Sequence, residues 1–369
     1  MIEALQTRFT QIKSLYENYE HFVNPGLFVF GFTFDSVFMD RIDNTFFIAQ
    51  HFIYISLVTI ILFFYTLTEK TEFQIQPKLK KVWRFSDDAL HFLLGSLLSV
   101  FFWLYVTSSV FTTSFLFLLI LFLILVANEL NYFKKYGLIF KFILFQIALI
   151  SFFTCLVPVA IGSVGPFIYY FSIIISFLAS FLILYLFFKK HVPLNVLKKQ
   201  ILPVVIGAHL FFVFIYIMKW APAVPLSVKY TGVYHKIEKQ DGDYILKYHR
   251  SWWKFWQNGA QDFVAGPNDK LIVFTSVFAP RNFKDHVYLV FEAIPEGQTE
   301  WQLQDKIKLE LMGGRSMGFR GYAEKSNYFE GPWRTRILTS DEREMGRIYF
   351  DITKQETALK KEDLKTDIF

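Results

Sequence analysis

Six apolar runs constrain this chain more than any other feature of its sequence. The hydrocarbon core of a bilayer is about 30 Å thick, and an α-helix needs roughly 20 apolar residues to cross it. Runs of about this length lie at 44–67, 89–106, 112–129, 139–157, 166–188 and 201–219. The composition agrees, because 53% of the 369 residues are hydrophobic and 46 are Phe. The sequence therefore predicts an α-helical integral membrane domain.

A shorter apolar run, LFVFGFTFDSVFM, lies at 27–39 and carries Asp35. It is short for a span, and a half-buried helix is the alternative. A span at this position makes the chain cross the bilayer seven times, which agrees with the loop charges described next. We therefore predict a seven-span domain over residues 27–221.

Basic residues gather in every second connection between the apolar runs, as short cytoplasmic loops do. One set of connections, with the N-terminal segment, holds 14 Lys or Arg, whereas the other set holds only Arg41. This asymmetry predicts a cytoplasmic N-terminus and an extracytoplasmic C-terminal region. The 14 are Arg8, Lys13, Lys70, Lys78, Lys80, Lys81, Arg84, Lys134, Lys135, Lys141, Lys189, Lys190, Lys198 and Lys199.

Residues 1–26 are polar overall, so no cleavable signal peptide is expected there. Apolar side chains recur in this segment at helical spacing. We expect an amphipathic helix that lies on the cytoplasmic face of the membrane or packs on a partner helix, ending at Pro25 and Gly26.

Beyond Trp220 the hydrophobic period changes from that of a helix to that of a strand. In 303–312, Ile307, Leu309 and Leu311 alternate with charged residues, as in a half-buried antiparallel strand. We predict an antiparallel β-sandwich over 222–353, with an open barrel as the alternative, and a charged tail at 354–369 that is helical or disordered. Further strands are predicted at 228–237, 243–250, 270–278, 286–294, 333–339 and 346–352.

Several cations and one tryptophan near the C-terminal glycines are candidates for binding an anion. Arginine forks hold carboxylates and phosphates through two hydrogen bonds, so an anionic lipid head group or acidic glycan is one hypothesis. The alternative is that these cations pair with nearby carboxylates of the same domain. The candidates are Arg315, Arg320, Lys325, Trp333 and Arg334.

Polar residues within the apolar runs form the second candidate group, because burying them in lipid is costly. Asp35 and His51 could pair across the first two spans, while Asn128 and Glu129 lie at the end of a span. His209 lies in the last apolar run. Structural pairing or a helix terminus is the ordinary explanation for each of these residues.

The stretch SWWKFWQ at 251–257 concentrates four large aromatic residues. Trp and Phe at this density are typical of the bilayer interface, where indoles are enriched, or of a platform that stacks on sugars. Because the stretch follows the last span by about 30 residues, we expect contact with the interface or with the membrane half.

No motif for catalysis is present, and we expect neither enzymatic activity nor a cofactor. His235, His249 and His286 lack a metal-ligand spacing. Asp341, Glu342 and Glu344 in the DERE turn are predicted to be solvated. Residues 222–369 hold 22 basic and 21 acidic residues, which argues against nucleic-acid binding. Cys155 is the sole cysteine, so no intramolecular disulfide can form.

Four C-terminal stretches resemble a bacterial domain-of-unknown-function family, the one numbered 2914. They are FTSVFAP (274–280), WQLQDKI (301–307), GGRSMGFRGYAEKSNYFEGPWR (313–334) and GRIYF (346–350). Stretches such as LVANEL (125–130) and PVAIGSVG (158–165) are similar to the multi-span segment that accompanies this domain. The resemblance implies a bacterial inner-membrane protein with a periplasmic domain, and it implies no catalytic residue.

Together these features predict an envelope protein with a binding, scaffolding or sensing role. Its β-domain would recognise a protein or an anionic ligand, and the bilayer is its first partner. The alternative is a transporter or lipid-handling protein that uses Asp35, His51 and Glu129. The sequence indicates no oligomeric state.

Overall fold

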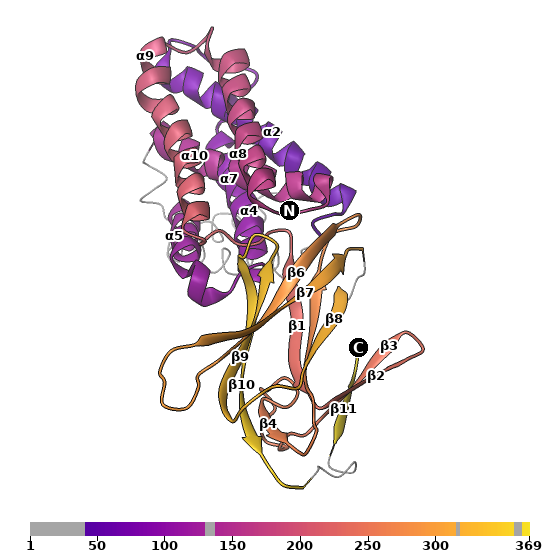
Figure 1. Ribbon diagram of the computed structural model, residues 1–369. Coiled ribbons are helices and arrows are strands. Elements are labelled where there is room, and N and C mark those ends of the chain that lie inside the picture. Colours follow the sequence, from indigo (N-terminus) through magenta and orange to yellow (C-terminus); the bar gives the residue numbers. More distant parts are fainter. Residues whose placement is uncertain (1–40, 130–136, 315–317, 358–363) are drawn as a thin grey trace, which may run out of the picture. The chain divides into compact units, whose positions relative to one another are not determined.

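The computed structural model describes residues 41–129, 137–314, 318–357 and 364–369 (Figure 1). The predicted span at 27–39, with Asp35, and the predicted helix over 1–26 lie outside these ranges, as does Arg315. The chain divides into two compact units, and several helices contribute segments to both. Unit 1 comprises 1–103, 118–153 and 174–211, and unit 2 comprises 104–117, 154–173 and 212–369.

Among the residues that the structure describes, six helices are long and apolar enough to cross a membrane. They confirm the six long runs: α2 Thr45–Lys70, α4 Ser86–Thr107, α5 Phe111–Glu129, α7 Gly137–Ile161, α8 Pro166–Ile183 with η1 Leu184–Phe188, and α9 Leu194–Val196 with η2 Leu197–Ile201 and α10 Leu202–Ile217. A short helix, α3 (Lys80–Trp83), precedes α4. The Asn44 side chain caps α2 by accepting a hydrogen bond from Phe46 N.

The lipid-facing character of these helices appears in their exposed side chains. Phe46, Phe92 and Phe167 are between 69% and 78% exposed although they are large and apolar. Within unit 1, Leu94 and Leu97 are fully buried between helices. Large apolar residues exposed along long helices are expected where the surrounding medium is lipid rather than water.

Within the described residues, the C-terminal part of unit 2 forms three β-sheets. Seven of their strand pairs are antiparallel, and one pair, β4 with β10, is parallel. Among the described residues none of the sheets closes into a barrel, so the open-barrel alternative is wrong. The sheet orders are β1-β5-β8, β4-β10-β9-β6-β7 and β11-β3-β2. Their strands are β1 Ser227–Tyr234, β2 Lys236–Gln240, β3 Asp243–Tyr248, β4 Asp262–Ala265, β5 Leu271–Phe278, β6 Lys284–Ala293, β7 Gln302–Met312, β8 Phe319–Lys325, β9 Gly331–Thr339, β10 Glu344–Lys354 and β11 Lys365–Ile368.

The first two sheets enclose one hydrophobic core. Phe274 of β5, Phe291 of β6 and Trp333 of β9 are buried in it, and Ile337 and Phe350 extend it along the larger sheet. In β7, Ile307, Leu309 and Leu311 are more buried than the charged residues between them, which confirms the predicted alternation. The predicted sandwich-like fold is therefore confirmed.

Three secondary-structure predictions are wrong. The strand predicted at 228–237 is divided at His235, because β1 pairs with β5 whereas β2 forms a hairpin with β3. The glycine-rich stretch 313–334 contains β8, which was missing from the predicted strands. Part of the tail, β11, pairs with β3, and Phe369 packs on Tyr230 with ring centroids 4.4 Å apart.

One glycine of that stretch is required by packing. A Cβ atom on Gly313 would lie 1.8 Å from the carbonyl oxygen of Pro280, so no other residue fits without moving the backbone. This close approach brings the end of β7 onto the turn between β5 and β6.

Candidate functional site

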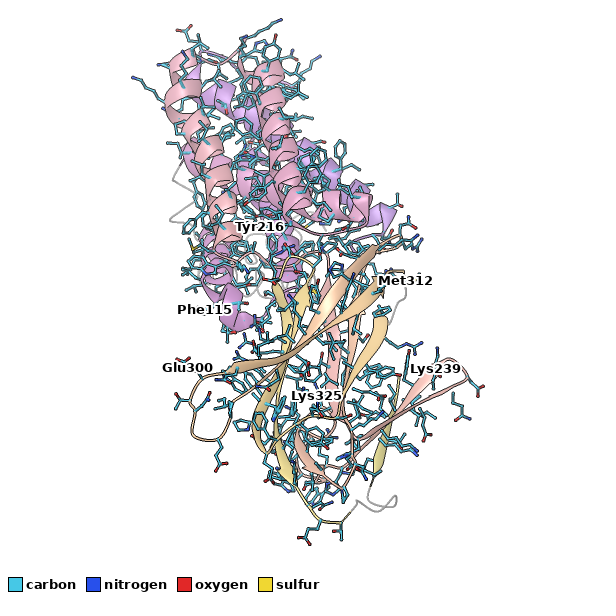
Figure 2. The ribbon with its side chains drawn as sticks, in the orientation of Figure 1. Phe115, Tyr216, Lys239, Glu300, Met312 and Lys325 are labelled. Atoms are coloured by element: carbon cyan, nitrogen blue, oxygen red, sulfur yellow. The ribbon has the colours of Figure 1, made fainter. Side chains whose placement is uncertain are left out.

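The described part of unit 2 contains a cluster of buried polar groups where the turn between β9 and β10 meets helix ends. We call this cluster the junction, and it comprises Tyr216, Pro222, Asp341 and Arg343. The hydroxyl of Tyr216, near the end of α10, donates a hydrogen bond to Asp341 Oδ2 over 2.6 Å. Figure 2 marks Tyr216 at this position. The turn places Asp341 there with help from Glu342, whose φ of 63° reverses the chain.

Arg343 makes three contacts within the junction. Its Nε donates to Asp341 Oδ2 over 2.7 Å, and its Nη1 donates to the carbonyl oxygen of Pro222 over 2.7 Å. Its guanidinium also lies 5.2 Å from the ring centroid of Tyr216, within range of a cation–π interaction. The side chains of Asp341 and Arg343 are only 3% and 5% exposed. Asp341 is thus not the solvated turn residue that we predicted, because its counter-charge is supplied inside the fold.

Burial by itself would raise the pKa of the Asp341 carboxyl. The Arg343 guanidinium and the hydroxyls of Thr339 and Tyr216 outweigh that effect, so the pKa of Asp341 lies below its usual value. Asp341 is therefore ionised at neutral pH, and the junction contains a true buried ion pair.

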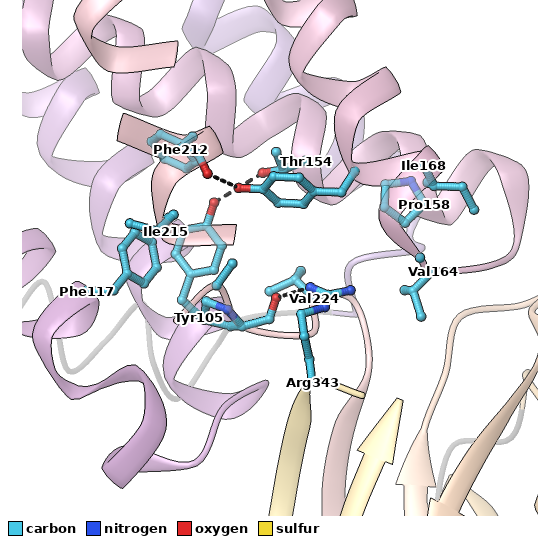
Figure 3. Close-up of a pocket in the computed structure, with 14 residues that line it drawn as sticks. Tyr105, Phe117, Thr154, Pro158, Val164, Ile168, Phe212, Ile215, Val224 and Arg343 are labelled. Atoms are coloured by element: carbon cyan, nitrogen blue, oxygen red, sulfur yellow. Dashed lines mark hydrogen bonds between the residues drawn. The ribbon is translucent and has the colours of Figure 1, made fainter. Parts of the chain in front are cut away.

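A small cavity lies beside Arg343 (Figure 3). Two tyrosines from helix segments of unit 2 border it, and their hydroxyls have partners: Tyr105 lies 3.2 Å from Thr154 Oγ1, and Tyr169 donates to the carbonyl oxygen of Phe212 over 3.0 Å. The cavity volume is about 20 Å³, which is room for about one water molecule. Its size excludes an organic substrate, so the junction is a structural connection rather than a ligand pocket.

Asp285, the second residue of β6, forms a second connection within unit 2. Its Oδ2 accepts hydrogen bonds from Val164 N over 3.0 Å and from Ser163 Oγ over 3.1 Å, both in the loop between α7 and α8. Gly162 precedes them with φ of 81°, and its carbonyl oxygen accepts from Lys284 N over 2.9 Å. A Cβ atom on Gly162 would lie 2.7 Å from the carbonyl oxygen of Asn282.

The four described members of the predicted anion-binding set are each engaged within the domain. Arg320 donates to Gly242 O over 3.1 Å, and Arg334 Nε lies 2.5 Å from Glu292 Oε2. Lys325, labelled in Figure 2, pairs with Asp305. Trp333 is 1% exposed, with Nε1 donating to Phe329 O over 3.0 Å. Each described cation of this group has a partner within the domain.

The predicted intramembrane residues of unit 1 are also engaged locally. His51 is buried, with Nδ1 2.7 Å from Phe47 O, and His209 Nε2 lies 3.0 Å from Ser176 Oγ. Asn128 donates from Nδ2 to His91 O over 3.2 Å. Glu129 is the last residue of α5, and its side chain lies outside the described set.

Sequence reasoning missed an ion pair in unit 1. Lys141, which we predicted in a cytoplasmic loop, lies in α7 with its side chain 2% exposed and pairs with Asp87 of α4. Its Nζ lies 3.7 Å from the ring centroid of Tyr65. Four residues beyond Asp87, His91 Nδ1 lies 3.2 Å from Asn128 Oδ1. Asp87 and His91 lie four residues apart, on one face of α4. This spacing was the sequence signal for a polar cluster at this position.

These features define a membrane protein with an N-terminal helical region and a C-terminal β-domain. The model of the family described as "Protein of unknown function (DUF2914)" matches residues 288–352, from β6 to β10. This match confirms the resemblance for the C-terminal region and includes Asp341 and Arg343. No curated protein matches the chain in sequence.

Comparison with solved structures adds no functional information. A β-glucosidase from Listeria innocua in complex with glucose is 11% identical over 26% of this chain and 15% of its own, with a TM-score of 0.20. An immunoglobulin-like protein from Pseudomonas aeruginosa is 13% identical over 33% and 96%, with a TM-score of 0.20. An alkylpurine DNA glycosylase from Pseudomonas fluorescens bound to DNA with an abasic site analogue is 9% identical over 85% and 100%, with a TM-score of 0.23. These scores are too low to indicate a common fold or function.

Proposed function

We propose that this chain is a binding, scaffolding or sensing protein of the bacterial inner membrane. Its N-terminus lies in the cytoplasm and its β-domain lies in the periplasm. The β-domain recognises a protein or an anionic ligand, and the junction relays the state of the domain to the helix ends. The observation that supports this role most directly is the buried ion pair of Asp341 and Arg343, which binds the β-domain turn to Tyr216 and Pro222.

A simple anchor would not need such a connection. A flexible linker after the last helix would hold a domain at the membrane without burying a charge. A buried ion pair, by contrast, is stable only when closely placed partners offset the free energy of desolvating its charges. A carboxylate bound by one tyrosine hydroxyl and one guanidinium positions the turn in one orientation. A shift of the β9–β10 turn would therefore pull on the end of α10, which is what a relay requires.

The orientation rests on the uneven distribution of Lys and Arg along the sequence. Lys141 is buried in unit 1 and thus does not count as a loop charge. With Lys141 removed from the comparison, the basic residues still favour a cytoplasmic N-terminus overwhelmingly, so the proposed orientation does not depend on it.

Recognition by the β-domain can be tested with the full chain extracted in mild detergent. Proteins and lipids that co-purify with the wild type are identified and compared with those of Arg320→Ala and Arg334→Ala. Loss of the same component from either variant, with unchanged thermal unfolding, supports recognition through these arginines. Lys239→Ala is the matched control, because Lys239 is an exposed cation of β2 outside the predicted set (Figure 2). No selective component in any preparation would contradict a binding role.

Transport is the second candidate, and the ion pair of Asp87 and Lys141 favours it. Ionisable side chains inside a helical membrane region often mark pathways for ions or substrates. Asp87, His91 and Lys141 were not among the predicted residues, and they join Asp35, His51 and Glu129 as candidates for this role. Fluxes of protons and of sodium are compared in proteoliposomes that contain the wild type or the Asp87→Asn/Lys141→Met double variant. A flux that the double variant abolishes supports transport, and equal fluxes in empty liposomes contradict it.

A further inference from the structure

The SWWKFWQ stretch forms an exposed aromatic projection on unit 2, which we call the aromatic loop, residues 251–257. Trp252 and Phe255 are 85% and 81% exposed, and Trp253 and Trp256 are 50% and 59% exposed. A side chain of this size presents roughly 150–250 Å², so the four expose on the order of 400–700 Å² together. Apolar patches of this size on a protein surface usually mark a contact site.

The aromatic loop is held in place by its own hydrogen bonds. Lys254 N donates to Ser251 O over 3.2 Å, and Gln257 N donates to Lys254 O over 3.1 Å, which forms two successive turns. Arg250 donates to the carbonyl oxygen of Gln257. The rings are thus presented by an ordered backbone and do not need to be fixed when a partner binds.

The loop lies far along unit 2 from the junction. It directly precedes β4, which pairs with residues Asp351–Lys354 at the end of β10. Arg343 immediately precedes β10, and Asp351 lies eight positions beyond it. At about 3.3 Å per residue this separation is about 26 Å. Figure 1 shows β10 as one continuous strand ending beside β4. The loop therefore does not lie beside Tyr216 and Pro222, at the end of the last span. From the sequence we expected the loop there, in contact with the bilayer interface or the membrane half.

The shape and charge of the loop favour a lipid surface over a specific ligand. The planes of Trp253 and Trp256 are inclined by 63°, and those of Phe255 and Trp256 by 79°, so the rings project in different directions and form no flat platform. The loop's cation, Lys254, pairs with Asp262, and Gln257 Nε2 donates to the same carboxylate over 3.0 Å. A sugar site needs polar groups that fix the ligand's orientation. Here Lys254 and Gln257 are turned onto Asp262 instead.

We propose that the aromatic loop inserts Trp252 and Phe255 into the interface of a lipid surface other than the bilayer that the protein's own helices cross. Indole and phenyl rings partition into the head-group region of bilayers, and binding increases with the apolar area that is buried. Because the charges of the loop are compensated internally, the interaction is independent of anionic lipid. The inference does not depend on the relay proposed for the junction.

The test uses the full chain in nanodiscs, mixed with phosphatidylcholine vesicles and with vesicles that also contain phosphatidylglycerol. Wild-type nanodiscs are expected to co-float with both kinds of vesicle. Trp252→Ser/Phe255→Ser is expected to lower the affinity for vesicles at least tenfold without changing thermal unfolding. Leu303→Ser/Met312→Ser is the matched control, since both residues are 63% exposed on β7, and it should co-float as the wild type does.

Four results would overturn the proposal. The first is wild-type nanodiscs that co-float no better than empty nanodiscs, and the second is a control variant that loses affinity as the aromatic variant does. The third is competition by a soluble oligomer of N-acetylglucosamine, which would show that the rings stack on sugars. Binding only to phosphatidylglycerol vesicles would likewise contradict an interaction driven by apolar insertion.

Discussion

Replacing Arg343 by methionine tests whether the junction holds unit 2 together. Methionine retains much of the apolar stem but removes the charge and its hydrogen bonds to Asp341 and Pro222. Asp341, whose side chain is 3% exposed, would then remain as a buried carboxylate bound only by hydroxyls. Leaving one member of a buried ion pair without its partner costs about 3–5 kcal/mol. We expect Arg343→Met to lower the free energy of unfolding by an amount in this range.

The double variant Asp341→Asn/Arg343→Met separates the charge effect from lost packing. With both charges removed, no uncompensated carboxylate is buried, and replacing a whole buried pair by uncharged groups is often close to neutral. We expect this variant to lose about 0–2 kcal/mol, less than the single variant. Arg343→Lys is expected to fall between them, because lysine keeps the charge but lacks the planar fork.

The sole cysteine of the chain provides the assay. Cys155 is 3% exposed and follows Thr154, which borders the cavity beside Arg343. Alkylation of the protein in nanodiscs therefore reports opening of this part of unit 2. If opening becomes easier by about 3 kcal/mol, alkylation should accelerate about 100-fold, since 1.4 kcal/mol corresponds to a factor of ten. Alkylation within twofold of the wild-type rate, or a double variant as unstable as the single one, would refute the reasoning.

Three further predictions concern other parts of the chain. Gly162→Ala should lower the free energy of unfolding by about 1–3 kcal/mol, because φ is 81° and the new Cβ would meet Asn282 O. Gly207→Ala is the control, since a Cβ at this position of α10 would lie in open space. Equal losses in the two variants would contradict this account. Burial, aided by His249 and opposed by Asp269, lowers the pKa of His235 to about 4. As the pH falls from about 6.5 toward 4, the unfolded chain gains a proton that the folded chain does not, so the free energy of unfolding should fall by about 3 kcal/mol. In chemical unfolding, His235→Gln should show a weaker dependence of this free energy on pH. A pH dependence equal to that of the wild type would exclude His235 as its source. Alkaline phosphatase fused after Phe369 should be active, as expected for a periplasmic C-terminus, whereas activity of a cytosolic reporter at that position would reverse the proposed orientation.

Local sequence patterns predicted the secondary structure where a single physical signal dominates. Hydrophobic length defined the six helices, because a bilayer requires each span to be apolar over a fixed distance. Alternation or a short apolar run identified β5, β6, β7, β9 and β10. In β7 one face lies toward the core, whereas β5 is buried along its whole length. Short strands with weak alternation, such as β4 and β11, escaped because they form only against a partner strand distant in sequence.

The candidate site was predicted only in part. The turn that carries Asp341 and Arg343 was recognised, but its charges were assigned to solvent, which is the ordinary place for such residues. Likewise, Lys141 resembles any lysine near a helix end. Helix packing buries it and brings its ammonium group to Asp87, which lies 54 positions earlier in the chain.

The sequence alone thus determined that the chain has a membrane-spanning helical region and a β-rich C-terminal domain, because hydropathy and alternation are properties of neighbouring residues. The tertiary structure decided which charges are buried and paired, because Arg343 meets Pro222 and Tyr216, and Lys141 meets Asp87, only after distant segments pack together. It also decided that the aromatic loop lies away from the junction, since the loop precedes β4, and β4 pairs with the far end of β10, about 26 Å along that strand from Arg343.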